Sequence, residues 1–305
     1  MGKASRTKVD SSRREKIAAQ RAAARRAEQR RRILIASGSV VVVLAIVVAF
    51  IVIKLNSSPA TDNSPNGPTG AALASVVTKV TSVPASTLDT VGDGSGSVTA
   101  PPTSISTALT ANGKPEVLYM GAEYCPYCAA ERWAMIVALS RFGTFSGLAT
   151  VHSAAANGAG NAEPYPNTPT WTFVHATYTS QYLTFSTVEE QTNIPDPSTG
   201  TYTTLQTPTK AQEALVTKYD SSSGGAIPFV DFGNKYVISG ASYDAGVLSG
   251  LSWATIASDL SNPNSAVAKA VDGTANYITA AICQLTGNQP ASACTATVKS
   301  LESKI

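Results

Sequence analysis

One uninterrupted apolar segment divides the hydrophobic pattern of the chain. Residues 33–53 read ILIASGSVVVVLAIVVAFIVI and include no charged side chain. At about 1.5 Å per residue, a helix of this length spans the roughly 30 Å hydrocarbon core of a bilayer. The segment is longer than the apolar core of a signal peptide, and no small-residue cleavage site follows at Lys54. We therefore predict an uncleaved transmembrane helix at 33–53.

Shorter periodic segments follow and predict an α/β domain over residues 71–305. Leu73, Val76 and Val80 share one face of a short helix. Residues 92–104 and 153–169 are small and polar and predict loops. The remaining elements are strands at 115–121, 148–152, 170–175 and 182–185, helices at 129–142 and 209–219, a hairpin at 227–239 around Gly233 and Asn234, and helices at 244–259, 264–286 and 291–303.

Charge is distributed unevenly on the two sides of the apolar segment. Residues 1–32 contain 12 Lys/Arg and 3 acidic residues, a balance of +9. The remaining residues contain 11 Lys/Arg and 17 acidic residues, a balance of −6. The positive-inside rule therefore places the N-terminus in the cytoplasm and residues 54–305 outside it. The protein is expected to be a single-pass protein of the cell membrane.

Four regions result from this division. They are a basic cytoplasmic tail at 1–32, the transmembrane helix at 33–53, a flexible Ser/Pro/Asn/Gly linker at 54–70 and an extracytoplasmic domain at 71–305. The Arg/Ala-rich end of the tail is compatible with nucleic-acid binding, but its proximity to the membrane favours a topology signal that contacts anionic lipid. We expect membrane lipid as a partner of the N-terminal helix and no nucleic acid.

The most informative chemistry lies directly after the strand predicted at 115–121. Cys125-Pro126-Tyr127-Cys128 opens the next helix. At a helix N-terminus the free backbone N–H groups and the dipole favour an anion, so the Cys125 thiolate is populated near neutral pH. Pro126 fits the first turn, where its missing N–H has no consequence. Cys128 returns beside Cys125 after three residues and is placed to resolve a mixed disulfide.

The chain resembles the thioredoxin superfamily at these residues, and the quartet is of the glutaredoxin type. The resemblance implies a thioredoxin-like domain with a helical insertion and C-terminal helices. It also implies a cis-proline at Ile227-Pro228, which presents backbone to an extended substrate beside Cys125. YMGAEYCPYC, IPFVDFGNKYVISGASY and the late cysteine pair together resemble a family of membrane-anchored proteins, domain of unknown function 929.

Three interpretations of Cys125 and Cys128 stay open: redox exchange, a zinc site, or a structural disulfide in a binding module. Redox exchange is favoured, because a zinc site needs about four Cys or His ligands. Apart from this pair, the chain offers His152, His175, Cys283 and Cys294.

The late cysteines, Cys283 and Cys294, are eleven residues apart between two predicted helices. In an exported domain this spacing favours a structural disulfide over an electron relay. Near the quartet, Glu123 and Glu131 either tune the thiols or are surface charges, and we favour surface charges.

The aromatic residues around the quartet suggest a site for unfolded peptides. Tyr124 and Tyr127 are candidate substrate contacts, together with Ile227 and Pro228. Trp133 is a third aromatic candidate, although its position favours the core.

The sequence thus predicts a membrane-anchored thiol–disulfide oxidoreductase that acts on exported proteins. It requires no bound cofactor and no metal, and it needs a redox partner that the sequence does not identify. The alternative is a non-catalytic thioredoxin-fold module that binds peptides or envelope partners. An accessible Cys125 that cycles between dithiol and disulfide distinguishes the first from the second. The direction of the reaction stays open, because the environment sets the redox poise.

Overall fold

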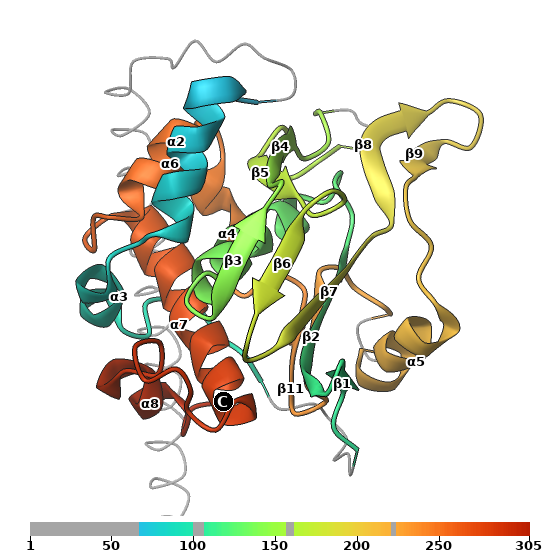
Figure 1. Ribbon diagram of the computed structural model, residues 1–305. Coiled ribbons are helices and arrows are strands. Elements are labelled where there is room, and N and C mark those ends of the chain that lie inside the picture. Colours follow the sequence, from blue (N-terminus) through green and yellow to red (C-terminus); the bar gives the residue numbers. More distant parts are fainter. Residues whose placement is uncertain (1–66, 100–106, 157–161, 221–223) are drawn as a thin grey trace, which may run out of the picture. The chain divides into compact units, whose positions relative to one another are not determined.

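The computed structural model describes residues 67–99, 107–156, 162–220 and 224–305, which belong to one compact unit, Thr61–Ile305 (Figure 1). The predicted tail, transmembrane helix and most of the linker lie outside the described residues. Within the described part, no single helix has both the length and the apolarity to cross a membrane, whereas the bent pair of α2 (Gly70–Thr81) and α3 (Ala85–Val91) meets both criteria together.

The largest sheet has the order β7, β2, β10, β11, with a short β1 beside the start of β2. Its strands are β1 (Thr110–Ala111), β2 (Lys114–Gly121), β7 (Thr184–Glu189), β10 (Phe229–Phe232) and β11 (Tyr236–Ser239). β2 runs parallel to β7 and antiparallel to β10, and β10 and β11 form an antiparallel hairpin. The register places Gly121 opposite Glu189 and Met120 opposite Phe229.

Helices lie on both faces of this sheet (Figure 1). They are α4 (Pro126–Leu139), α5 (Lys210–Tyr219), a 3-10 turn η3 (Ala245–Leu248), α6 (Trp253–Asp259), α7 (Ala266–Leu285) and α8 (Ala296–Leu301). Alternate residues of β2 belong to two different cores, as the two-residue period of a strand requires. Val117 and Tyr119 pack in the large core with α4 and α7, whereas Leu118 and Met120 pack with α5.

Helix α4 is at the centre of the larger core, and all of its side chains except Tyr127 are buried. The indole N–H of Trp133 on α4 donates to the carbonyl of Pro169 at 2.9 Å. Trp253 of α6 donates to the neighbouring carbonyl of Thr170 at 2.8 Å. Trp133 is therefore a core residue, as its position in the sequence favoured.

The structure confirms a mixed helix and sheet domain and corrects several predicted elements. The helix predicted at 244–259 is divided into η3 and α6, because Gly250 adopts a positive φ of 72° and Ser252 caps a new helix. Within the described residues, the predicted helical insertion consists of α5 alone. Between α4 and α5 lie three two-stranded sheets, which pair β3 (Gly143–Ser146) with β6 (Thr177–Ser180), β4 (Ala149–His152) with β5 (Pro169–Thr172), and β8 (Gln191–Asp196) with β9 (Thr201–Thr204).

Packing begins before Ala71, the predicted start of the domain. Gly67 and Pro68 are buried. The carbonyl of Pro68 accepts a hydrogen bond from the hydroxyl of Thr150 on β4 at 3.3 Å. The last residues of the predicted linker are thus part of the folded unit.

Cys283 and Cys294 are joined in a disulfide, the pairing expected from the sequence. It connects the end of α7 to the segment before α8, and both residues are buried. Replacing both cysteines with serine is expected to lower the free energy of unfolding by about 3 kcal/mol, because the unfolded chain loses a short closed loop. Urea denaturation of the full chain measures this change, and an unchanged midpoint would contradict it.

Two carboxyl groups are buried in the core, one on α4 and one on α7, and the burial of Glu131 corrects the surface position favoured for it. Glu131 is fully buried and accepts hydrogen bonds from the backbone N–H and hydroxyl of Ser242 at 2.9 and 3.3 Å. Asp272 of α7 is also fully buried, and no described residue donates to either of its oxygens. Burial raises the pKa of Glu131 to about 7 and that of Asp272 to about 8.

These raised pKa values predict a loss of stability as the pH rises. Unfolded Asp and Glu titrate near pH ~4, so between that value and about 8 the folded chain binds more protons than the unfolded chain. The free energy of unfolding should therefore fall from about pH 5 to about pH 8. Asp272→Asn and Glu131→Gln should each flatten this slope in urea titrations. If both variants keep the slope of the wild-type chain, the pH dependence of stability comes from other groups.

Candidate functional site

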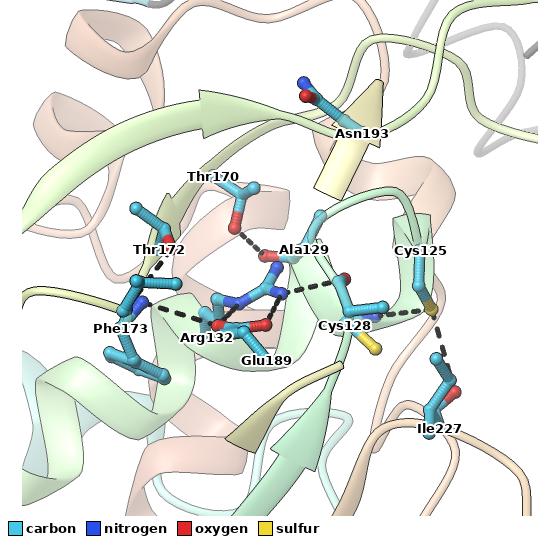
Figure 2. A network of polar contacts seen from close by, with 12 residues as sticks. Cys125, Cys128, Ala129, Arg132, Thr170, Thr172, Phe173, Glu189, Asn193 and Ile227 are labelled. Atoms are coloured by element: carbon cyan, nitrogen blue, oxygen red, sulfur yellow. Dashed lines mark hydrogen bonds and ion pairs between the residues drawn. The ribbon is translucent and has the colours of Figure 1, made fainter. Parts of the chain in front are cut away.

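The cysteine quartet lies where β2 leads into α4 (Figure 2). Cys125 is the N-cap residue of α4, and Pro126 occupies the first turn. The sulfur of Cys125 accepts a hydrogen bond from the backbone N–H of Cys128 at 3.2 Å. One of the free N–H groups at the helix N-terminus is thus paired with the sulfur, as the placement of the quartet predicted.

Cys125 also faces the segment that precedes β10. Its sulfur lies 3.7 Å from the carbonyl oxygen of Ile227, and the Ile227–Pro228 peptide bond is cis (Figure 2). Both Cys125 and Cys128 are free thiols. Cys128 is fully buried and Cys125 is only 4% exposed. The accessible Cys125 expected of a catalytic pair is therefore not present in this conformation.

The two thiols have opposite shifts in pKa. Burial alone raises the pKa of Cys125, but the hydrogen bonds from the thiol and backbone N–H of Cys128, together with the charge of Arg132, outweigh it and leave the pKa lowered. Burial raises the pKa of Cys128 well above its ordinary value, and the hydrogen bond to Cys125 raises it further. Of the two thiols, Cys125 is thus the one that ionises more readily.

A buried ion pair lies beside the quartet (Figure 2). Arg132, one turn after Cys128 on α4, donates from Nε and Nη2 to the two carboxylate oxygens of Glu189 at 2.8 and 2.6 Å. Nη2 also donates to the carbonyl of Ala122 at 2.8 Å, in the loop that carries the quartet. Neither side chain of the pair is exposed. The bidentate geometry fixes the guanidinium at a defined position beneath the thiols.

The sequence analysis missed Arg132 and Glu189, although one signal was present. Arg132 follows Glu131 within a helix that is otherwise mainly apolar, and it precedes a run of seven apolar residues, Trp133 to Leu139. A charged residue in such a helix needs a buried partner if both faces are covered. The partner was not visible in the sequence, because Glu189 is 57 residues away at the end of β7.

Close packing joins β2 to Cys128. The guanidinium of Arg132 lies over the ring of Tyr119 at 5.6 Å. A Cβ atom on Gly121 would lie 2.3 Å from the hydroxyl oxygen of Tyr119 and 3.1 Å from the sulfur of Cys128. Glycine is therefore required at 121, and the Tyr119 hydroxyl and Cys128 sulfur share this corner of the site.

The aromatic residues considered as client contacts differ in how exposed they are. Tyr127 is 41% exposed and packs edge-on against Tyr165. Tyr124 is half-buried and stacks on Tyr202 of β9, with ring centroids 4.3 Å apart. Trp133, in the core, contributes nothing to the rim. The exposed aromatic side chain beside the quartet is thus Tyr127, with Tyr165 from the loop between β4 and β5 packed against it.

Glu123 is buried as well, so the surface position favoured for it is wrong. It is 8% exposed, and its backbone N–H donates to the carbonyl of Gln191 on β8 at 2.8 Å. Burial raises the pKa of its carboxyl group, against a hydrogen bond from Thr172. The backbone of this residue ties the loop before Cys125 to β8.

The other residues considered as zinc ligands do not lie together. Within the described ranges, no three His, Cys, Asp or Glu side chains are close enough together to hold a metal ion. His152 packs edge-on against Trp253, and His175 is exposed. Cys283 and Cys294 are bonded to each other.

A family model described as Domain of unknown function (DUF929) matches residues 103–284, more than half of the chain. The chain belongs to this family. The match confirms the resemblance to this family that was drawn from YMGAEYCPYC, IPFVDFGNKYVISGASY and the late cysteine pair. No curated protein and no solved structure matches the chain. The DUF929 match includes both quartet cysteines, Arg132, Glu189 and Pro228, so the whole candidate site lies inside it.

Alkylation of the DUF929 site should distinguish its two thiols. In the reduced full chain, iodoacetamide is expected to label Cys125 before Cys128, at a rate that rises with an apparent pKa below the roughly 8.5 of a free cysteine. The reason is the N–H and thiol hydrogen bonds that Cys125 accepts. Mass spectrometry of timed samples from pH 5 to 9 measures both sites. Preferential labelling of Cys128 would reverse the assignment of nucleophile and resolving thiol.

Proposed function

We propose that the chain is a thiol–disulfide oxidoreductase with a thioredoxin-like domain, in which Cys125 is the nucleophile and Cys128 the resolving thiol. The observation that carries the proposal is the placement of Cys125. It caps α4, accepts the N–H of Cys128 at 3.2 Å and lies 3.7 Å from the carbonyl of Ile227. A low-pKa thiol beside a protonated partner is the arrangement that exchange chemistry requires.

The order of elements supports a thioredoxin-like fold. A central strand, β2, leads into the helix that carries the quartet. A second strand, β7, is parallel to it on one side, and the β10–β11 hairpin is antiparallel to it on the other. The hairpin begins directly after Pro228, so the proline is brought to the same edge of the sheet as Cys125.

The chemistry balances without a bound cofactor. The Cys125 thiolate attacks one sulfur of a client disulfide, which forms a mixed disulfide and releases one client thiolate. Cys128 then loses its proton and attacks the sulfur of Cys125, which releases the second client thiolate and leaves a Cys125–Cys128 disulfide. Two electrons pass to the client, and a dithiol partner returns them to the pair. The reverse sequence oxidises a client dithiol, with a disulfide oxidant as partner.

The proposed place of action and the proposed clients rest on the sequence. The charge step around residues 33–53 supports a membrane anchor with the catalytic domain outside the cytoplasm, so the clients are exported proteins. Tyr124, Tyr127, Ile227 and Pro228 surround Cys125 and are the proposed client contacts.

The test is reversible cycling. The full chain is equilibrated in glutathione buffers of graded potential, and the state of the 125–128 pair is read by alkylation and mass spectrometry. We expect one two-electron transition, together with exchange of a disulfide-bonded peptide that Cys125→Ser abolishes. Cys283→Ser/Cys294→Ser is the matched control and should retain exchange. A pair that neither cycles nor exchanges refutes the proposal.

A second candidate is a non-catalytic binding module, and one observation favours it. Cys125 is only 4% exposed, with Ile227 against its sulfur. In that case client peptides bind the same edge without covalent chemistry. Peptide binding that is unchanged in Cys125→Ser, without any redox cycling, is the result expected for this candidate.

A further inference from the structure

A cavity of about 270 Å³ lies beside Ile227 and is lined by residues of α5 and of the start of β10. Its apolar wall consists of Met120 of β2, Val216 of α5 and Phe229 of β10. Ile227 lines the cavity, and its carbonyl oxygen also contacts the sulfur of Cys125 at 3.7 Å. A polypeptide that reaches Cys125 along the Ile227–Pro228 backbone therefore passes the mouth of this cavity.

Two carboxylates give the cavity its charge. Glu190, directly after β7, is half-buried, and Glu213 lies on the exposed side of α5. Burial raises the pKa of Glu190, and the charge of Glu213 raises it further, so the two groups repel each other. No described residue forms an ion pair with either carboxylate, and no Lys or Arg lines the cavity.

This combination selects for one kind of occupant. An apolar wall accepts the methylene groups of a long side chain, and the two carboxylates at its edge accept a cationic head. A cation placed between them relieves their mutual repulsion as well. A glutathione molecule, with two carboxylates and one ammonium group, brings net negative charge to the same place and is disfavoured.

We propose that this cavity binds a lysine or arginine side chain of the client, close in sequence to the client cysteine that exchanges with Cys125. The proposal rests on the function proposed above, and it adds the substrate class: exported polypeptides with a basic residue beside the reacting cysteine. Glu190 and Glu213 are then specificity-determining residues that take no part in bond making.

The experiment compares short disulfide-bonded peptides that differ only in one residue beside the cysteine: lysine, glutamine or glutamate. With the full chain at low ionic strength, the lysine peptide should have a kcat/KM about fivefold to tenfold higher than the glutamate peptide, chiefly through KM, because partly exposed ion pairs contribute modestly. In Glu190→Gln/Glu213→Gln the ratio should fall close to one. Glu116→Gln, at the opposite end of β2, removes one charge away from the cavity and should preserve the ratio.

A binding arm separates this proposal from the oxidoreductase proposal. The same peptides with serine in place of cysteine, labelled with a fluorophore, are titrated against the chain and followed by anisotropy. Tighter binding of the lysine peptide that is lost in the double variant supports the cavity even if no exchange occurs. Equal binding of lysine and glutamate peptides, or a preference that the double variant retains, overturns it whether or not exchange is observed.

Discussion

Arg132→Met is expected to lower the free energy of unfolding by about 3–5 kcal/mol, the usual effect of leaving one member of a buried ion pair without its partner. The reason is Glu189, whose carboxylate is fully buried and accepts two hydrogen bonds from the guanidinium. Without Arg132, the carboxylate keeps only a long bond from the backbone N–H of Phe173 at 3.4 Å. Urea denaturation of the full chain measures the loss.

The same variant should change the chemistry of the thiols. The positive charge of Arg132 lowers the pKa of both Cys125 and Cys128, so its removal should raise the apparent pKa of Cys125 in the alkylation titration. A purely structural role would not produce this effect. A raised pKa of Cys125 would identify Arg132 as a positioning residue that acts through the thiols.

The matched control is Arg132→Met/Glu189→Met. Replacing a buried pair by apolar residues of similar volume is often neutral, so the double variant should recover most of the stability lost in Arg132→Met. It still lacks the guanidinium, so the pKa of Cys125 should stay raised. A double variant with a wild-type pKa for Cys125 would show that Arg132 contributes only to packing.

The local pattern of the sequence was sufficient to predict the elements that surround the quartet. The buried strand at 115–121, the helix after Cys125 and the hairpin at 227–239 correspond to β2, α4 and β10–β11. Each has strong periodicity or turn chemistry within a few residues, such as Gly233 and Asn234 with their positive φ angles. The strands β3 and β6 are short and rich in Thr and Ser, and each pairs with a partner more than 30 residues away. The strands β8 and β9 form a local hairpin, but they are mostly polar and have no clear apolar alternation.

The burial of these charged residues could not be predicted from the sequence, for a related reason. Glu131 lies on a face of α4 that a helix on the surface would present to solvent, but α7 and the segment around Ser242 cover that face. Glu123 is buried because β8 pairs with the loop before Cys125. Both coverings are formed by segments more than 60 residues away, so the charge of each side chain could be identified but its environment could not.

Cys128→Ser is expected to accumulate a mixed disulfide between Cys125 and a client, because the resolving attack is removed while the nucleophile stays intact. Serine keeps the backbone N–H of residue 128, which donates to the Cys125 sulfur at 3.2 Å, so the α4 N-terminus should still favour the thiolate. The thiol hydrogen bond from Cys128 is replaced by one from the serine hydroxyl. Non-reducing electrophoresis of cells that express the full chain should show new, reducible bands.

Two variants make this result specific. Cys125→Ser should give no such bands, because Cys128 is fully buried and holds its proton. Cys283→Ser/Cys294→Ser should trap nothing beyond the wild type, because that pair stabilises the α7–α8 end of the domain. Bands in Cys125→Ser would make Cys128 the nucleophile. Their absence in Cys128→Ser would mean that the 4% of Cys125 that is exposed is not enough for a client to reach it, and the peptide-binding module would then be the better account of the site.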